Sequence, residues 1–111
     1  GNTGCLETVA SDSALAWHAS QKLGRAVNAD EVIELAKSSA VDLRAELREV
    51  AGFVAVGVAA VVNLFNPAAL FVHTPLFEID SSLFELVCEL ARQRALPPSF
   101  AECDIVRAKG S

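Results

Sequence analysis

The 111 residues of this chain fit one domain, large enough to bury a core of modest size. Hydrophobic residues make up 52% of the sequence and charged residues 21%, which excludes a disordered, highly charged chain. The formal net charge is −5 and no basic run exceeds two residues, so we do not expect this segment to neutralise a row of phosphates. The composition therefore predicts a globular domain that does not itself bind nucleic acid.

Three cysteines, Cys5, Cys88 and Cys103, are widely spaced. Their number is odd and the sequence has no signal-peptide pattern, so a disulfide framework is not expected. The simplest interpretation is a protein of the reducing cytoplasm.

The first helix is predicted to begin around Cys5 and to end at Gly24. Its apolar stripe recurs at helical spacing and consists of Leu6, Val9, Ala10, Ala14 and Trp17. Asn28, followed three residues later by Glu31, predicts the start of a second, short helix that runs to Lys37.

A long helix is predicted from about residue 40 to residue 64, with Ser39 and Asp42 as its start signals. Residues 50–65 are almost wholly apolar, but a membrane-spanning helix needs roughly 18–20 apolar residues. Asn66-Pro67 ends the helix, because proline disfavours helical geometry in the residue before it. We expect a buried core helix and no membrane contact.

The last third of the chain predicts a strand, a helix and a second strand. The strand covers residues 69–73, the helix is capped by Asp80 or Ser81 and ends before Pro97-Pro98, and the second strand covers residues 103–106. A right-handed crossover of this kind joins parallel strands. The expected fold class is α/β, with about four helices and a short two-strand parallel β-α-β unit, and so small a sheet suggests that partner elements lie elsewhere.

Three segments resemble one protein family. Residues 1–11 (GNTGCLETVAS) resemble the end of the ROK signature C-x-C-G-x-x-G-C-L-E-x-x-A-S, residues 62–67 (VNLFNP) resemble the end of the family's long helix, and residues 92–98 (RQRALPP) resemble its R-x-x-A-L-P segment. The three occur in family order, so the resemblance identifies residues 1–111 as the later, partial portion of a ROK (repressor and sugar-kinase) domain. It implies the fold of the actin-like ATPases.

The resemblance also implies roles for two residues. Cys5 matches the last of four zinc ligands in the family, and the other three ligands would precede residue 1, so these residues alone cannot complete a four-ligand zinc site. Glu7 matches the glutamate that binds sugar hydroxyls, a task suited to a carboxylate because it accepts several hydrogen bonds. The alternative for Glu7 is a first-turn glutamate favoured by the helix dipole.

The turn after residues 69–73 departs from the pattern of the family kinases, which have a glycine-rich turn near the nucleotide. Here it reads His73-Thr74-Pro75, whose side chains and missing donor hinder a close approach of phosphate. ATP binding is therefore doubtful, and the turn looks more like that of the repressors that respond to glucose or N-acetylglucosamine. His73 itself is interpreted as a strand-end histidine with a local hydrogen bond.

The other candidates have structural interpretations. Trp17 is assigned to the core or to a subunit interface, and Asp12, Asp30 and Asp80 to helix starts or the surface. No nucleophile triad, Walker loop or dinucleotide fingerprint is present.

Three functions follow from this reasoning. The first is a sugar-sensing part of a ROK-family transcriptional repressor, not itself an enzyme, whose DNA-binding segment lies outside these residues. The second is part of an ATP-dependent sugar kinase. The third is an interaction module that self-associates through the apolar half of the long helix, consistent with a homo-oligomer.

Overall fold

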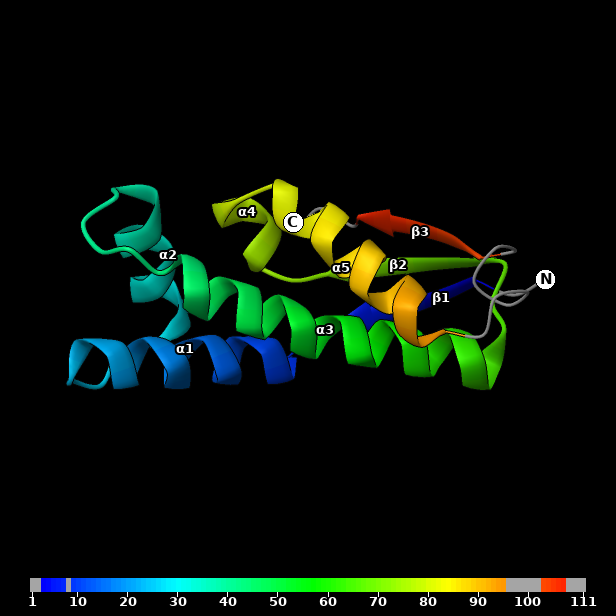
Figure 1. Cartoon of the computed structure of the whole chain (residues 1–111), viewed down its shortest axis with the longest axis horizontal. Helices are drawn as coiled ribbons and strands as arrows, with labels where there is room; N and C mark the ends of the chain where they lie inside the picture. Colours follow the sequence, from blue (N-terminus) through cyan, green and yellow to red (C-terminus); the bar gives the residue numbers. More distant parts are fainter. Residues whose placement is uncertain (1–2, 8, 96–102, 108–111) are drawn as a thin grey trace.

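The computed structural model of the chain describes residues 3–7, 9–95 and 103–107, with side chains placed for residues 12–95 and 103–107. The elements lie along a molecule that measures 44 × 28 × 20 Å (Figure 1). In chain order they are β1 (Thr3–Glu7), α1 (Val9–Leu23), α2 (Ala29–Lys37), α3 (Arg44–Phe65), β2 (Ala69–His73), α4 (Leu76–Ile79), α5 (Ser82–Arg94) and β3 (Asp104–Arg107).

The described strands form one parallel sheet in the order β1-β2-β3, with β2 in the centre. Leu70 and Val72 of β2 are fully buried and join the core with side chains of α3 and α5. Phe71, which lies between them, is 38% exposed. One face of the sheet is therefore covered by helices, while the opposite face is open at Phe71.

The predicted β-α-β unit is confirmed, since β2 and β3 pair in parallel and are connected through α5. The expectation of a helix from Cys5 was wrong, because Thr3–Glu7 is a third strand and α1 begins only at Val9. Leu6 fitted the helical spacing, but pairing with β2 decides its conformation, and this information is absent from a local pattern.

The side of α1 that faces the core also differs from the prediction. Among the described side chains of α1, Leu15 and Ala19 are buried, whereas Trp17 is 59% exposed. Gly24 ends the helix as predicted, with a φ of 70° that suits a residue without a side chain. Ala14 of the predicted stripe packs against the core, Trp17 does not, and the side chains of Leu6, Val9 and Ala10 lie outside the described side chains.

The start of α2 is confirmed, because Asn28 Oδ1 accepts a 2.9 Å hydrogen bond from the Glu31 N–H. The start of α3 is later than predicted. Ser39 adopts a left-handed φ of 58° and turns the chain, so α3 begins at Arg44. At its end, Asn66 is left-handed with a φ of 45°.

The short helix α4 was not predicted, and with it the structure describes five helices. It occupies the connection between β2 and α5, and Leu76 and Phe77 are buried there. Helix α5 begins one or two residues after the predicted cap, at Ser82. The predicted stop at Pro97-Pro98 lies outside the described residues.

Helix α3 is the central helix that the sequence predicted. By length and mean hydropathy (1.7) it could cross a membrane, but it packs against α1 and α5 and lies over the sheet. The residues it buries are Leu47, Val50, Ala51, Val54, Ala55, Val58, Ala59 and Val62. These contacts identify it as a core helix of this fold.

Candidate ligand site at the carboxyl edge of the sheet

The candidate site lies where β1 and β2 end. The two strands are parallel and in register, so Glu7, the last residue of β1, is opposite His73, the last residue of β2. Cys5 is opposite Phe71, two residues earlier in each strand. In open parallel sheets, ligands bind beyond the carboxyl ends of the strands. The backbone therefore places the position of Glu7 where a ligand site is expected.

The secondary structure also bears on the alternative explanation of Glu7. A glutamate in the first turn of a helix is favoured by the helix dipole whatever its function. Glu7 belongs to β1, and α1 begins two residues later at Val9. The helix dipole therefore does not explain why a glutamate stands at position 7.

Asp12 adds a second carboxylate near this edge. It lies in the first turn of α1, and its pKa is raised by burial and then by the charge of Asp30, while His73 opposes the rise. Asp12 Oδ1 is buried and has no hydrogen-bond partner among the described residues. An acceptor in this condition is suited to a ligand hydroxyl.

Sequence reasoning treated Asp12 and Asp30 as helix-start or surface carboxylates. In the structure the charges of both Asp30 and His73 act on the pKa of Asp12. The signal that could have indicated Asp12 is its place in the helix turn that directly follows a strand. That signal was hidden because the strand itself was predicted as helix.

The turn after β2 keeps its backbone donors occupied. The Leu76 N–H donates to Thr74 Oγ1 (3.3 Å), the Phe77 N–H to the Thr74 carbonyl (3.4 Å) and the Glu78 N–H to the Pro75 carbonyl (3.0 Å). Pro75 has no N–H, and Thr74 is 3% exposed. Phosphate binding in such turns depends on free backbone N–H groups, and the N–H groups of residues 76–78 are engaged within the chain.

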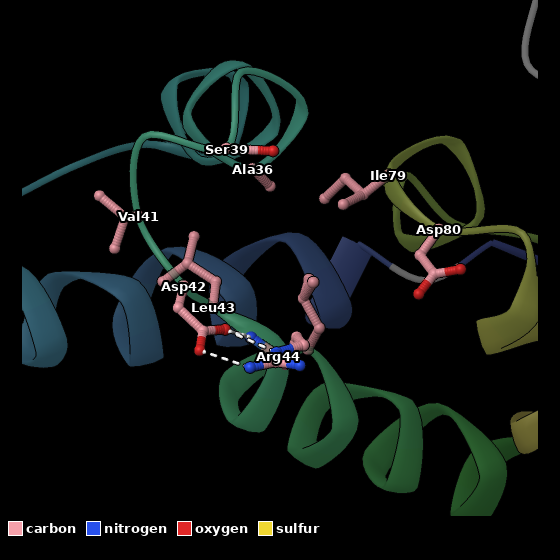
Figure 2. Close-up of a pocket in the computed structure, with 9 residues that line it drawn as sticks. Ala36, Ser39, Val41, Asp42, Leu43, Arg44, Ile79 and Asp80 are labelled. Carbon is pink, nitrogen blue, oxygen red and sulfur yellow. Dashed lines mark hydrogen bonds and ion pairs between the residues drawn. The ribbon is translucent and has the colours of Figure 1, made fainter.

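Figure 2 shows residues that line an open surface pocket between residues 36–47 and the end of α4. The volume of this pocket is about 430 Å³. Its lining residues are Ala36, Ser39, Val41, Asp42, Leu43, Arg44, Leu47, Ile79 and Asp80. At its rim the Arg44 guanidinium donates to both oxygens of Asp42 at 3.0 Å and lowers the pKa of that carboxyl to about 2. Asp80 Oδ1 accepts hydrogen bonds from the N–H and hydroxyl of Ser82. These bonds leave the rim without a feature that points to a ligand.

The described residues contain no group of three or more histidine, cysteine or acidic residues that could hold a metal ion. Cys88 and Cys103 are free thiols, and burial raises the pKa of each. Neither thiol is therefore poised as a thiolate ligand. The side chains of Cys5 and Glu7 lie outside the described side chains.

Comparison with known proteins agrees with the fold and the motifs. The whole chain, residues 1–111, matches the model of the ROK family. The DNA-binding transcriptional repressor Mlc of Escherichia coli (strain K12) is 30% identical over 106 residues, which are 87% of this chain and 26% of Mlc.

A crystal structure of a ROK family transcriptional regulator, described as a homolog of the E. coli MLC protein, superposes with a TM-score of 0.52 at 20% sequence identity. The superposition covers 60% of this chain and 17% of that protein. The chain thus spans about a quarter or less of the length of these relatives, and over the 60% that superposes it shares the helix-rich α/β fold of the solved structure. The match over all 111 residues shows that the chain belongs to the ROK family.

Proposed function

We propose that this chain is the sugar-sensing part of a ROK-family transcriptional repressor, with Glu7 as a ligand of the sugar. Binding of the sugar shifts the protein between two arrangements of its lobes and thereby changes its affinity for DNA. The DNA contacts belong to a segment outside these residues, and the protein acts in the cytoplasm.

One observation favours a repressor over a kinase. The turn that follows β2 holds its N–H groups within the protein, and Pro75 removes another donor. A sugar kinase needs the γ-phosphate of ATP close to the sugar, whereas a sensor needs only the sugar. The similarity to Mlc supports the same choice.

The sugar site itself is supported by the position of Glu7 at the carboxyl edge, opposite His73, and by Asp12, whose pKa is influenced by His73 at the same edge. A carboxylate accepts two or more hydroxyl hydrogen bonds, and sugars present adjacent hydroxyls. The unpartnered oxygen of Asp12 is a further acceptor at this edge. We propose that both carboxylates bind hydroxyl groups of one sugar.

We also propose that Cys5 supplies one thiolate to a zinc ion whose remaining ligands lie outside this chain. Structural zinc takes four ligands, and the described residues do not supply them. Zinc would fix the end of β1 and with it the position of Glu7 two residues later. It would act on the structure of the site and take no part in a reaction.

The test uses the full-length protein that contains this chain. Isothermal titration with glucose, N-acetylglucosamine and related sugars identifies the ligand, and Glu7→Gln is expected to weaken it by at least about tenfold, because a hydrogen bond to a charged group contributes about 1.5–3 kcal/mol. The matched control is Glu85→Gln, an exposed glutamate of α5. Equal affinities in all three proteins would remove Glu7 from the site.

Two further measurements separate the repressor from the kinase. Operator binding, measured with and without the sugar, should differ at least about fivefold if sugar and DNA are coupled. Production of ADP from ATP and sugar should stay at the background rate. Turnover at enzyme-like rates would instead establish a sugar kinase and contradict our interpretation of the turn after β2.

A further inference from the structure

The candidate sugar site has an acidic electrostatic setting. Glu7 ends β1 opposite His73, and Asp12 follows in the first turn of α1. Burial and then the charge of Asp30, in the first turn of α2, raise the pKa of Asp12, while the charge of His73 lowers it. No lysine or arginine of the described residues is among the causes of this shift. Negative charge therefore dominates the surroundings of Asp12.

Two helix starts in this setting carry a carboxylate where an anion would otherwise bind. The N-terminus of an α-helix attracts phosphate, because its unpaired N–H groups and the helix dipole favour negative charge. Asp12 occupies the first turn of α1, and Asp30 occupies the first turn of α2, which Asn28 caps. A phosphate group at either helix start would meet a charge of its own sign, which is unfavourable.

The turn after β2 also offers few donors to an anion. The N–H groups of Leu76, Phe77 and Glu78 donate to oxygens within the chain, and Pro75 has no N–H. In parallel α/β sheets, backbone N–H groups at the carboxyl ends of the strands are common phosphate donors. An anionic ligand would have to break these hydrogen bonds before this turn could hold it.

Two nearby arginines already have partners. Arg107 ends β3 at the same edge of the sheet, and its guanidinium donates a 2.7 Å hydrogen bond to the Phe77 carbonyl. Arg25 precedes α2, and its guanidinium lies 3.5 Å from the Glu31 carboxylate. A phosphate group at this edge would have to draw one of these guanidinium groups away from its partner.

A neutral hydroxyl group suits the same setting. Asp12 Oδ1 is buried and has no hydrogen-bond partner among the described residues, so it is an available acceptor. A sugar hydroxyl donates a hydrogen bond to such an oxygen. A phosphate ester, by contrast, carries a charge of about −1.5 to −2 at pH 7 and presents mainly acceptor oxygens. The carboxylates therefore favour hydroxyl groups and repel a phosphate.

We propose that the ligand of this site is an unphosphorylated sugar, and that Asp12 and Asp30 exclude sugar phosphates by their charge. The inference rests on the proposed function and adds the chemical class of the ligand to it. Asp12 accepts from a hydroxyl of the sugar, whereas Asp30 acts on selectivity through its charge and does not touch the sugar.

The test is isothermal titration of the full-length protein with two matched pairs of ligands. The pairs are glucose with glucose 6-phosphate, and N-acetylglucosamine with N-acetylglucosamine 6-phosphate. We define the selectivity ratio as the dissociation constant of the phosphorylated sugar divided by that of the unphosphorylated sugar. The ratio is expected to be at least about ten for the pair that contains the ligand. It should fall at least about threefold between about 0.05 M and about 0.5 M salt, because salt screens the repulsion.

A variant tests the role of charge directly. Asp30→Asn should lower the selectivity ratio at least about threefold, because it removes a charge that acts on Asp12. The matched control is Glu34→Gln, which removes the same charge from an exposed position of α2 and should leave the ratio unchanged. Circular dichroism verifies that both variants fold.

The outcomes separate this inference from the proposed function. A ratio near or below one overturns the inference, whereas the proposed function stands if Glu7→Gln still weakens the unphosphorylated sugar. A large ratio that neither salt nor Asp30→Asn changes also overturns it, because shape would then exclude the phosphate. If neither pair binds, the sugar site itself is removed.

Discussion

Arg107, on the last strand, is expected to hold α4 in place. Its guanidinium donates a 2.7 Å hydrogen bond to the carbonyl oxygen of Phe77 and lies 5.8 Å from the centre of the Phe77 ring. Phe77 is 2% exposed, and its carbonyl is near the end of a four-residue helix, where carbonyls lack partners within the helix. Arg107→Met keeps much of the apolar stem but removes the donor.

The expected loss in the free energy of unfolding is about 2 kcal/mol. A hydrogen bond from a charged donor contributes about 1.5–3 kcal/mol, and a cation–π contact near the 6 Å limit adds about 0.5 kcal/mol or less. We take the middle of this range because the bond is only partly buried. Urea unfolding followed by circular dichroism measures the total, and hydrogen exchange of the amides of Leu76–Ile79 measures the local effect.

The matched control is Arg94→Met at the exposed end of α5, which should change stability by no more than about 0.5 kcal/mol. If both variants lose the same free energy, or if exchange in α4 is not accelerated by Arg107→Met, the guanidinium does not hold this helix.

Three further predictions concern α1 and the end of α3. Asp12→Asn should stabilise the protein at neutral pH by about 1 kcal/mol, because it removes a negative charge that burial and the charge of Asp30 make unfavourable in the folded state. The raised pKa means that the folded state holds the Asp12 proton more tightly than the unfolded state, so the gain in stability should appear as the pH rises above the ordinary value of 3.8 and vanish below it. Thermal melts at pH 3 and pH 7 compare the variant with the original protein. The same difference in melting temperature at both pH values would contradict the reasoning. Ser20→Ala should lower the free energy of unfolding, measured by chemical denaturation, by about 1 kcal/mol. The reason is that Ser20 Oγ accepts a hydrogen bond from the Val27 N–H (3.0 Å) and donates one to the Ala16 carbonyl (2.7 Å). The control Ser13→Ala, at an exposed position of α1, should leave this free energy unchanged. Asn66→Gly should raise the melting temperature slightly and Asn66→Val should lower it, because the left-handed φ of 45° is unfavourable for a branched side chain. A higher melting temperature for the valine variant than for the glycine variant would show that the φ of Asn66 does not govern the end of α3.

Local sequence patterns were sufficient wherever the deciding interactions lie within a few residues. Asn28 and Glu31 predicted the start of α2, Gly24 the end of α1, and Asn66-Pro67 the end of α3, since capping and backbone strain act over short distances. The apolar run 69–73 gave the bounds of β2 correctly. The three motifs, taken together and in their order along the chain, were enough to identify the family, and the family match confirms it.

Tertiary structure decided what depends on distant partners. Thr3–Glu7 became a strand because β2 pairs with it across more than sixty residues of sequence, and this in turn moved Glu7 from a helix turn to the edge of the sheet. The electrostatic effect of His73 on the pKa of Asp12 likewise depends on how the fold places α1 near β2.

The same limit explains Trp17 and α4. The spacing of apolar residues indicated a stripe on α1, but packing against α3 buries Leu15 and Ala19 and leaves Trp17 exposed. Helix α4 has four residues, too few for a periodic signal, and long-range contacts such as that of Arg107 stabilise it. The sequence by itself therefore determined the family, the helix ends and the central strand, whereas the third strand, the face of α1 that is buried and the neighbours of the candidate site required the folded chain.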